Sequence, residues 1–130
     1  MAEGNAMHSA VAMVKSSDGS LIDSCQQLGN ALGLVPHTQR RAAGWLLELL
    51  NEEAAVAIFD WDQDDPDNLV WIQLVRQLRP KVPLIVLHDG YIDHATGVKF
   101  CEQKVFYFCQ RPIDPQVLRE VLQAALQSGK

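Results

Sequence analysis

The 130-residue chain is long enough for one domain with a hydrophobic core and too short for two domains of ordinary size. Its 48% hydrophobic and 21% charged residues are typical of a globular protein and exclude a disordered chain. The net charge of −5 argues against a nucleic-acid-binding surface, and no apolar run approaches the roughly 20 residues of a membrane span.

Five short apolar runs alternate with stretches of helical spacing along the chain. A continuous run of this kind is typical of a strand covered on both faces, as in a parallel sheet. The apolar runs cover residues 10–14, 34–35, 54–59, 82–87 and 105–109. Helical spacing of apolar residues extends over about 21–32, 41–51, 67 or 68 to 80, 91–102 and 115–126. The sequence therefore predicts strand followed by helix, five times over.

Residues that start or stop helices stand at the ends of these stretches. Ser20 is placed to cap the first helix, and Gly33 is placed to end it. Asp114 is placed to cap the last helix, and Pro115 fits its first position, where a missing N–H costs nothing.

Strict alternation of strand and helix predicts a single α/β domain over residues 1–130. We expect a doubly wound, five-stranded parallel sheet in the flavodoxin-like order 2-1-3-4-5, with helices on both faces. Pro36 supports this order, because proline is tolerated mainly in an edge strand and the second strand is then an edge. Residues 1–8 are expected to be flexible.

Three cysteines stand at positions 25, 101 and 109, an odd number without CxxC spacing. Together with the four histidines they form no zinc-binding pattern. The N-terminal residues carry an acid and no basic region before an apolar block, so they do not resemble a signal peptide. We therefore expect a cytoplasmic protein with reduced thiols, no bound metal and no cofactor.

Polar residues gather where the predicted strands end. In a doubly wound sheet, ligands bind beyond the carboxyl ends of the strands, where the strand order reverses. The segments expected there are Lys15-Ser16-Ser17-Asp18, Asp60-Trp61-Asp62, His88-Asp89 and Arg111-Pro112. The sequence thus predicts a polar pocket at this edge of the sheet.

Several segments of the second half carry a resemblance to a known family. They are Phe-Asp-Trp-Asp at 59–62, Asp-Asn-Leu at 67–69, Val-Pro-Leu-Ile-Val-Leu at 82–87 and Phe-Cys-Gln-Arg-Pro-Ile at 108–113. In order and position they resemble a response-regulator receiver domain of bacterial two-component signalling. The resemblance implies that Asp60 corresponds to the phosphoryl-accepting aspartate and Phe108 to the aromatic residue that reports the switch.

Four positions depart from the receiver pattern. Lys15 and Ser16 (or Ser16 and Ser17, if the register is one residue later) stand where the family has the acidic pair that helps to hold Mg²⁺. His88 replaces a serine or threonine, and Arg111 replaces a lysine.

A single carboxylate beside a lysine is a poor magnesium site, because Mg²⁺ prefers an octahedral oxygen shell that includes one or two carboxylates. We expect Lys15 to lie near the Asp60 carboxylate, and Arg111 is able to form a bidentate pair with it. Asp62 is expected in the pocket and Trp61 at its rim. These residues indicate a degenerate receiver, or pseudo-receiver, that is not phosphorylated by the usual magnesium-dependent route.

Such a module is not an enzyme and signals by protein–protein contact. We expect a homodimer or partner surface formed by Val105, Phe106, Phe108 and the outer side of the last helix. The chain is then a stand-alone adaptor or the N-terminal domain of a transcriptional regulator. Two alternatives stay open: a receiver that still accepts a phosphoryl group at Asp60, and a small flavodoxin-like flavin or nucleotide binder or enzyme that uses residues 15–20 to hold phosphate.

Overall fold

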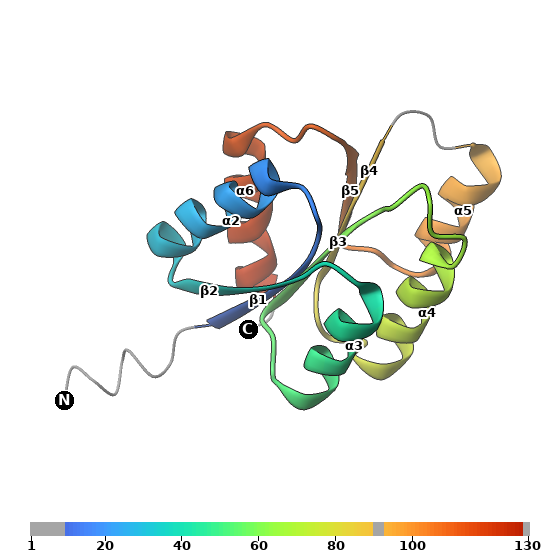
Figure 1. Ribbon diagram of the computed structural model, residues 1–130, viewed down its shortest axis with the longest axis horizontal. Coiled ribbons are helices and arrows are strands. Elements are labelled where there is room, and N and C mark those ends of the chain that lie inside the picture. The colour runs from blue at the N-terminus through green and yellow to red at the C-terminus, as the bar shows by residue number, and fades with distance from the viewer. Residues whose placement is uncertain (1–9, 90–92, 129–130) are drawn as a thin grey trace.

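The computed structural model describes residues 10–89 and 93–128 (Figure 1). The predicted flexibility of residues 1–8 and the predicted start of a helix at Tyr91 lie outside this part of the chain. Within it, no helix is both long enough and apolar enough to cross a bilayer.

Five parallel strands form one sheet in the order β2-β1-β3-β4-β5, which confirms the predicted fold. The three central strands are almost entirely buried, as expected for strands covered on both faces. The edge strand β2 runs on through Pro36 for six residues instead of the two that its apolar run indicates. The strands are β1 (Ala10–Lys15), β2 (Leu34–Gln39), β3 (Val56–Asp60), β4 (Leu84–His88) and β5 (Tyr107–Gln110).

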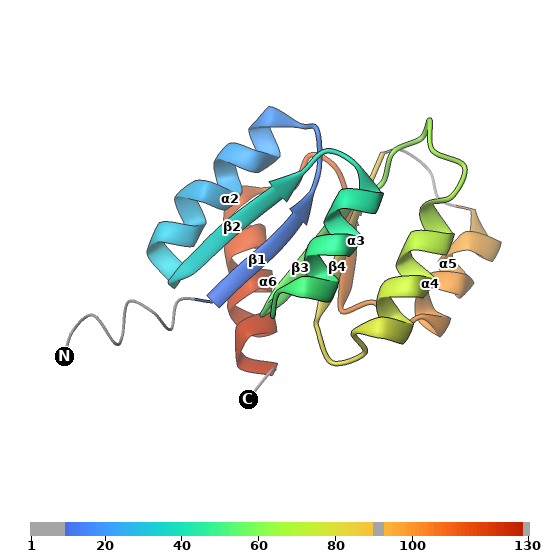
Figure 2. The same ribbon diagram turned by 60° about the horizontal axis from the view of Figure 1, so that its bottom comes forward.

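Helices cover both faces of the sheet (Figures 1 and 2). Two helices, α2 and α6, pack on one face, and α3, α4 and α5 pack on the other. Each face has its own apolar core, so the sheet lies between two hydrophobic layers. The helices are α2 (Gly19–Leu32), α3 (Ala42–Asn51), α4 (Asn68–Leu78), α5 (His94–Glu102) and α6 (Pro115–Ser128).

The start of α2 differs from the prediction. The cap is Asp18 and not Ser20, because the Asp18 carboxylate accepts a hydrogen bond from the Ser20 N–H at 3.0 Å. The helix therefore begins two residues earlier than its apolar stripe. Gly33 ends it at φ 73°, a left-handed conformation that favours glycine, and Asp114 caps α6 by accepting from the Gln116 N–H at 2.7 Å.

The strand register brings the polar segments together at one edge of the sheet. Lys15 of β1 pairs with Phe59, so the chain after β1 lies beside Asp60. Asp60 in turn pairs with Leu87, one residue before the end of β4. The carboxyl ends of the central strands thus open into the same region.

Candidate functional site

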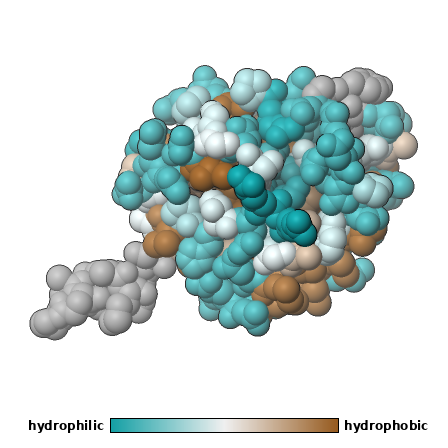
Figure 3. Space-filling view, viewed as in Figure 1, coloured by the Kyte–Doolittle hydropathy of each residue, from teal (hydrophilic) through white to brown (hydrophobic). Residues whose placement is uncertain are grey.

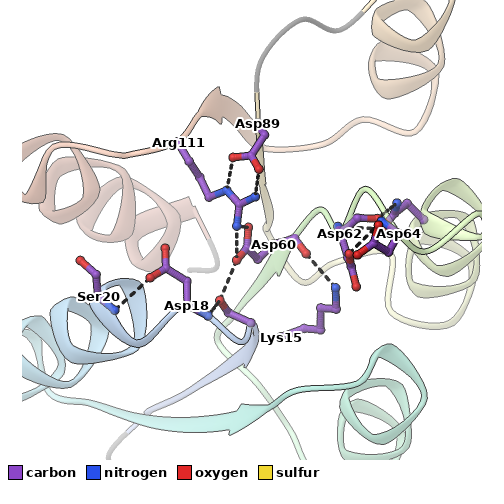
Figure 4. Close-up of polar contacts among 10 residues, drawn as sticks. Lys15, Asp18, Ser20, Asp60, Asp62, Asp64, Asp89 and Arg111 are labelled. Carbon is purple, nitrogen blue, oxygen red and sulfur yellow. Dashed lines mark hydrogen bonds and ion pairs between the residues drawn. The ribbon is translucent and has the colours of Figure 1, made fainter.

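A polar cavity of about 270 Å³ lies at the carboxyl ends of the strands. Its position matches the pocket expected from the strand order. Figure 4 shows the charged side chains that come from β1, β3 and the segments that follow β3, β4 and β5; Arg40, which follows β2, also lines the cavity. The lining residues are Lys15, Ser17, Arg40, Asp60, Trp61, Asp62, Gln63, Asp64, Asp89 and Arg111.

Asp60 is the central carboxylate of this cavity. It ends β3 and is only 4% exposed. The Ser16 hydroxyl donates a hydrogen bond to Oδ2 at 2.7 Å, and Nη1 of Arg111 donates to the same oxygen at 2.8 Å. The second oxygen, Oδ1, lies 2.7 Å from Nη1 of Arg111 but receives no hydrogen bond from the described residues. Burial raises the pKa of this carboxyl, while the Ser16 hydrogen bond and the Arg111 charge oppose the rise.

Arg111 joins two carboxylates. Its Nη1 faces Asp60, while Nε and Nη2 lie 2.9 and 2.5 Å from the two carboxylate oxygens of Asp89. The bidentate pair that was expected with Asp60 is therefore formed with Asp89 instead, as Figure 4 shows. The Arg111 N–H also donates to the His88 carbonyl at 2.7 Å, which ties its backbone to the end of β4. The peptide bond between Arg111 and Pro112 is cis.

Lys15 is buried beneath the cavity and is 4% exposed. Its ammonium group donates to the main-chain carbonyl of Asp60 at 2.8 Å and lies 4.7 Å from the centroid of the Phe59 ring. The predicted pairing with the Asp60 carboxylate is thus replaced by a bond to the carbonyl of the same residue (Figure 4). Burial lowers the Lys15 pKa, against the opposing charges of Asp62 and Asp60.

The loop after β3 is held in place by a buried side chain. Asn68, at the start of α4, donates to the carbonyls of Asp62 and Asp65 at 2.7 and 2.8 Å and accepts from the Asp62 N–H at 3.3 Å. Trp61 lines the cavity, as expected, and its ring packs edge-on against Phe100 at 5.4 Å. The acidic loop is therefore anchored to the fold at both ends.

His88 and Phe108 lie together away from the cavity lining. The His88 ring is buried, 6.0 Å from the Phe108 ring, and Phe108 packs 5.0 Å from Phe100 of α5. The Nδ1 atom of His88 is buried and has no hydrogen-bond partner among the described residues. The structure thus places His88 beside the expected switch aromatic and not among the residues that line the pocket.

Three residues that line the cavity were not among the sequence candidates: Arg40, Gln63 and Asp64. Gln63 and Asp64 directly follow the expected segment 60–62, whereas Asp89 was expected from its place after β4. Arg40 follows the end of β2, a strand predicted to stop five residues earlier, so no signal pointed to it. The remaining candidates Ser16, Ser17 and Asp62 lie where the strand ends predict them.

The Asp60 carboxylate already has partners within the protein. A hydroxyl and a guanidinium both donate to Oδ2, whereas Oδ1 lies close to the Arg111 guanidinium but receives no hydrogen bond from the described residues. The nearby carbonyl of Asp60 is used by Lys15. These contacts form an internal network of polar and charged groups around Asp60.

Comparisons with known proteins identify the fold. No protein-family model and no curated protein match the sequence. Among solved structures, a CheY-like response regulator receiver domain protein from Methanospirillum hungatei JF-1 superposes with a TM-score of 0.81 at 21% identity, over 92% of this chain and 95% of that one. The signal receiver domain of an HD domain-containing protein from Pseudomonas fluorescens Pf-5 gives 0.78 at 23% identity, over 92% and 88%.

A third similar structure is NtrX from Brucella abortus, at a TM-score of 0.75 and 17% identity. The match covers 93% of this chain but only 27% of NtrX, so there the same fold forms one part of a larger protein. Together with the strand order and the buried aspartate that ends β3, these likenesses show that the chain has the fold of a response-regulator receiver domain.

Proposed function

We propose that the chain is a receiver-like regulatory module of two-component-type signalling in which internal cations replace the metal at the phosphorylation site. The observation that carries this proposal is the position of Arg111, which holds Asp60 and Asp89 at once. In this reading Asp60 is a structural charge and not a phosphoryl acceptor, and the module acts in the cytoplasm through protein contacts and without catalysis.

The residues present do not fit a magnesium ion. Mg²⁺ keeps a near-octahedral oxygen shell and is usually held by one or two carboxylates. Here Lys15 and Ser16 stand where the family's acidic pair would be, and the remaining carboxylate of Asp60 already contacts Arg111. A Mg²⁺ ion at the Asp60 carboxylate would have to compete with the charge of Arg111 and would lie near the charge of Lys15, so a phosphoryl transfer that depends on the metal is disfavoured.

Incubation with acetyl phosphate and Mg²⁺, followed by intact mass measurement, tests the proposal. We expect no adduct on the wild-type chain. The double variant Lys15→Asp/Arg111→Lys restores an acid and a lysine to the family's pattern, and we expect it to gain one phosphoryl group. A wild-type adduct that disappears in Asp60→Asn would instead establish the alternative, a receiver that still accepts phosphate.

The flavin-binding alternative has no support from the geometry of the first loop. A phosphate held there needs the free N–H groups at the start of α2. The Asp18 carboxylate already accepts from the Ser20 N–H at this point, and its negative charge repels an anion. The same residues therefore favour a regulatory module over a flavodoxin-like binder.

The proposed output surface lies at the β5 edge of the sheet. Phe106 and Phe108 are both exposed and share one side of the strand, while Tyr107 and Cys109 pack toward α6 on the other side. Val98 is exposed on α5, the helix that covers the same face of the sheet as the two phenylalanines. We propose that a second copy of the chain, or a partner protein, covers these side chains together with the outer side of α6.

Light scattering after gel filtration at about 100 μM tests this surface. We expect a dimer for the wild type and a monomer for Phe106→Ser, because the substitution removes an exposed aromatic from the centre of the contact. Figure 3 shows a hydrophobic area near the lower ends of α3 and α4. Leu47 of α3, which is outside the proposed surface, is also exposed. Leu47→Ser is the matched control and should stay dimeric; a wild type that elutes only as a monomer would contradict the proposal.

A further inference from the structure

We propose that His37, Glu48 and Glu52 form a binding site for a divalent transition-metal ion, with zinc as the best match, where β2 meets α3. The site is independent of the function proposed above, because it uses none of the residues that line the Asp60 cavity. In the part of the chain that the structure describes, no other group of three histidine, cysteine or acidic side chains is as closely spaced.

The three ligand atoms are spaced as one metal ion requires. Nδ1 of His37 lies 3.0 Å from Oε2 of Glu52 and 3.7 Å from Oε2 of Glu48, and one ligand atom from each of the three side chains lies within 4.8 Å of the other two. Ligands about 2.0–2.1 Å from a tetrahedral zinc ion are separated by about 3.4 Å from each other. The two distances from His37 therefore bracket the value for a shared ion.

A neighbouring side chain fixes the orientation of one ligand. The amide Nε2 of Gln39 donates a hydrogen bond to Oε1 of Glu48, which leaves Oε2 of that carboxylate directed at His37. Gln39 can reach this position because α3 has a glycine beside it: a Cβ at Gly44 would lie 2.8 Å from Oε1 of Gln39. Such hydrogen bonds to ligands hold metal sites in shape.

The charges also favour a cation between these side chains. Glu48 and Glu52 are one helical turn apart, and like charges at this spacing repel. Two carboxylates and a neutral imidazole balance the charge of a divalent ion, and this mixed nitrogen and oxygen set suits zinc better than Mg²⁺, which prefers oxygen alone. The three side chains are 31–41% exposed, so water can complete the coordination shell.

The site has a structural consequence for the edge of the sheet. His37 belongs to β2, which lies at the edge of the described sheet beside β1. Glu48 lies in the last turn of α3, and Glu52 directly follows the helix as its C-cap. A bound ion would link the edge strand to the helix that covers it. An ion that binds the folded state and not the unfolded state increases the free energy of unfolding, so the unfolding temperature rises as the free metal concentration rises.

Isothermal titration of the chelator-treated full chain with zinc chloride at neutral pH tests the proposal. We expect one ion per chain, a higher unfolding temperature with zinc, and no displacement by excess Mg²⁺. His37→Gln and Glu52→Gln should each weaken binding by about tenfold or more. The matched controls are His94→Gln and Glu53→Gln, which make the same chemical changes at exposed positions outside the trio and should bind zinc as the wild type does.

Cobalt provides a second readout, because its visible spectrum distinguishes tetrahedral from octahedral coordination. We expect a tetrahedral spectrum in the wild type that is absent in His37→Gln. The proposal is wrong if the wild type binds no zinc, or if zinc binds equally well to His37→Gln, which would place the ion on other residues.

Discussion

Replacing Arg111 with methionine removes the charge that faces Asp60 while keeping much of the side-chain volume. Asp89 is half exposed, so water can replace its contact with Arg111 at little cost. The loss of stability therefore comes mainly from Asp60, which is 4% exposed and keeps only the hydrogen bond from the Ser16 hydroxyl. Breaking a buried ion pair from one side costs about 3–5 kcal/mol. Because Ser16 remains and Arg111 is itself 21% exposed, we expect a loss of ~2–3 kcal/mol, or roughly 10 °C in Tm for a domain of this size.

The loss should depend on pH in a defined direction. Burial raises the pKa of Asp60 in the folded state, and the charge of Arg111 opposes that rise, so Arg111→Met raises the pKa further. A carboxyl whose folded pKa lies above its unfolded value of about 3.9 favours folding when protonated, and this contribution is lost as pH rises through the folded pKa. The variant should therefore be weakest at neutral pH and approach the wild type as pH falls toward 4.

Urea unfolding followed by tryptophan fluorescence measures both effects. Arg40→Met is the control, since Arg40 lines the same cavity but forms no ion pair among the described residues. The double variant Asp60→Asn/Arg111→Met should recover most of the stability, because a neutral amide needs no counter-charge. A loss no larger than that of Arg40→Met, or one that is constant from pH 4 to 7, would refute the reasoning.

Two further predictions concern packing and thiol chemistry. Gly29→Ala should lower the free energy of unfolding in urea by about 1–3 kcal/mol, because the new Cβ would lie 2.7 Å from the Leu34 carbonyl oxygen. Gly97→Ala in α5, where the new Cβ meets open space, should raise the free energy of unfolding by ~0.5–1 kcal/mol. Equal effects of the two substitutions would argue against this packing. Burial raises the pKa of the Cys25 thiol to about 12. A disulfide reagent at pH 8 should therefore modify the exposed Cys101 in the native protein, but should modify Cys25 only after the protein unfolds. Rapid labelling of Cys25 in the native protein would contradict its burial.

The fold was predictable because it depends on patterns that repeat along the chain. Buried apolar runs identify the central strands, and alternation with helices restricts the strand order to very few choices. Pro36 then marks the edge strand. The same order predicts that Asp60 ends a central strand, with the segments containing Lys15 and Arg111 beside it.

The partners of these side chains were not predictable, because they depend on ångström-scale geometry. Whether Lys15 reaches the carbonyl or the carboxylate of Asp60 depends on how far its strand extends. The pairing of Arg111 with Asp89 joins two loops that are 22 residues apart in sequence. The side of the sheet taken by His88 depends on the last residue of β4, which a run of apolar residues does not define.

The proposed metal site shows the same limit. Its ligands lie on β2 and at the end of α3, and the apolar run that indicates β2 ends at Val35, before His37. A search for cysteine and histidine spacing also overlooks the two glutamates, whose side chains meet His37 only in the folded chain.

A crystal structure determined in millimolar MgCl₂ tests the central claim most directly. We predict that the Arg111 guanidinium stays on Asp60 and Asp89, that Lys15 stays on the Asp60 carbonyl, and that no ion replaces them. A hydrated divalent ion against the Asp60 carboxylate, with Lys15 and Arg111 both turned away, would contradict it.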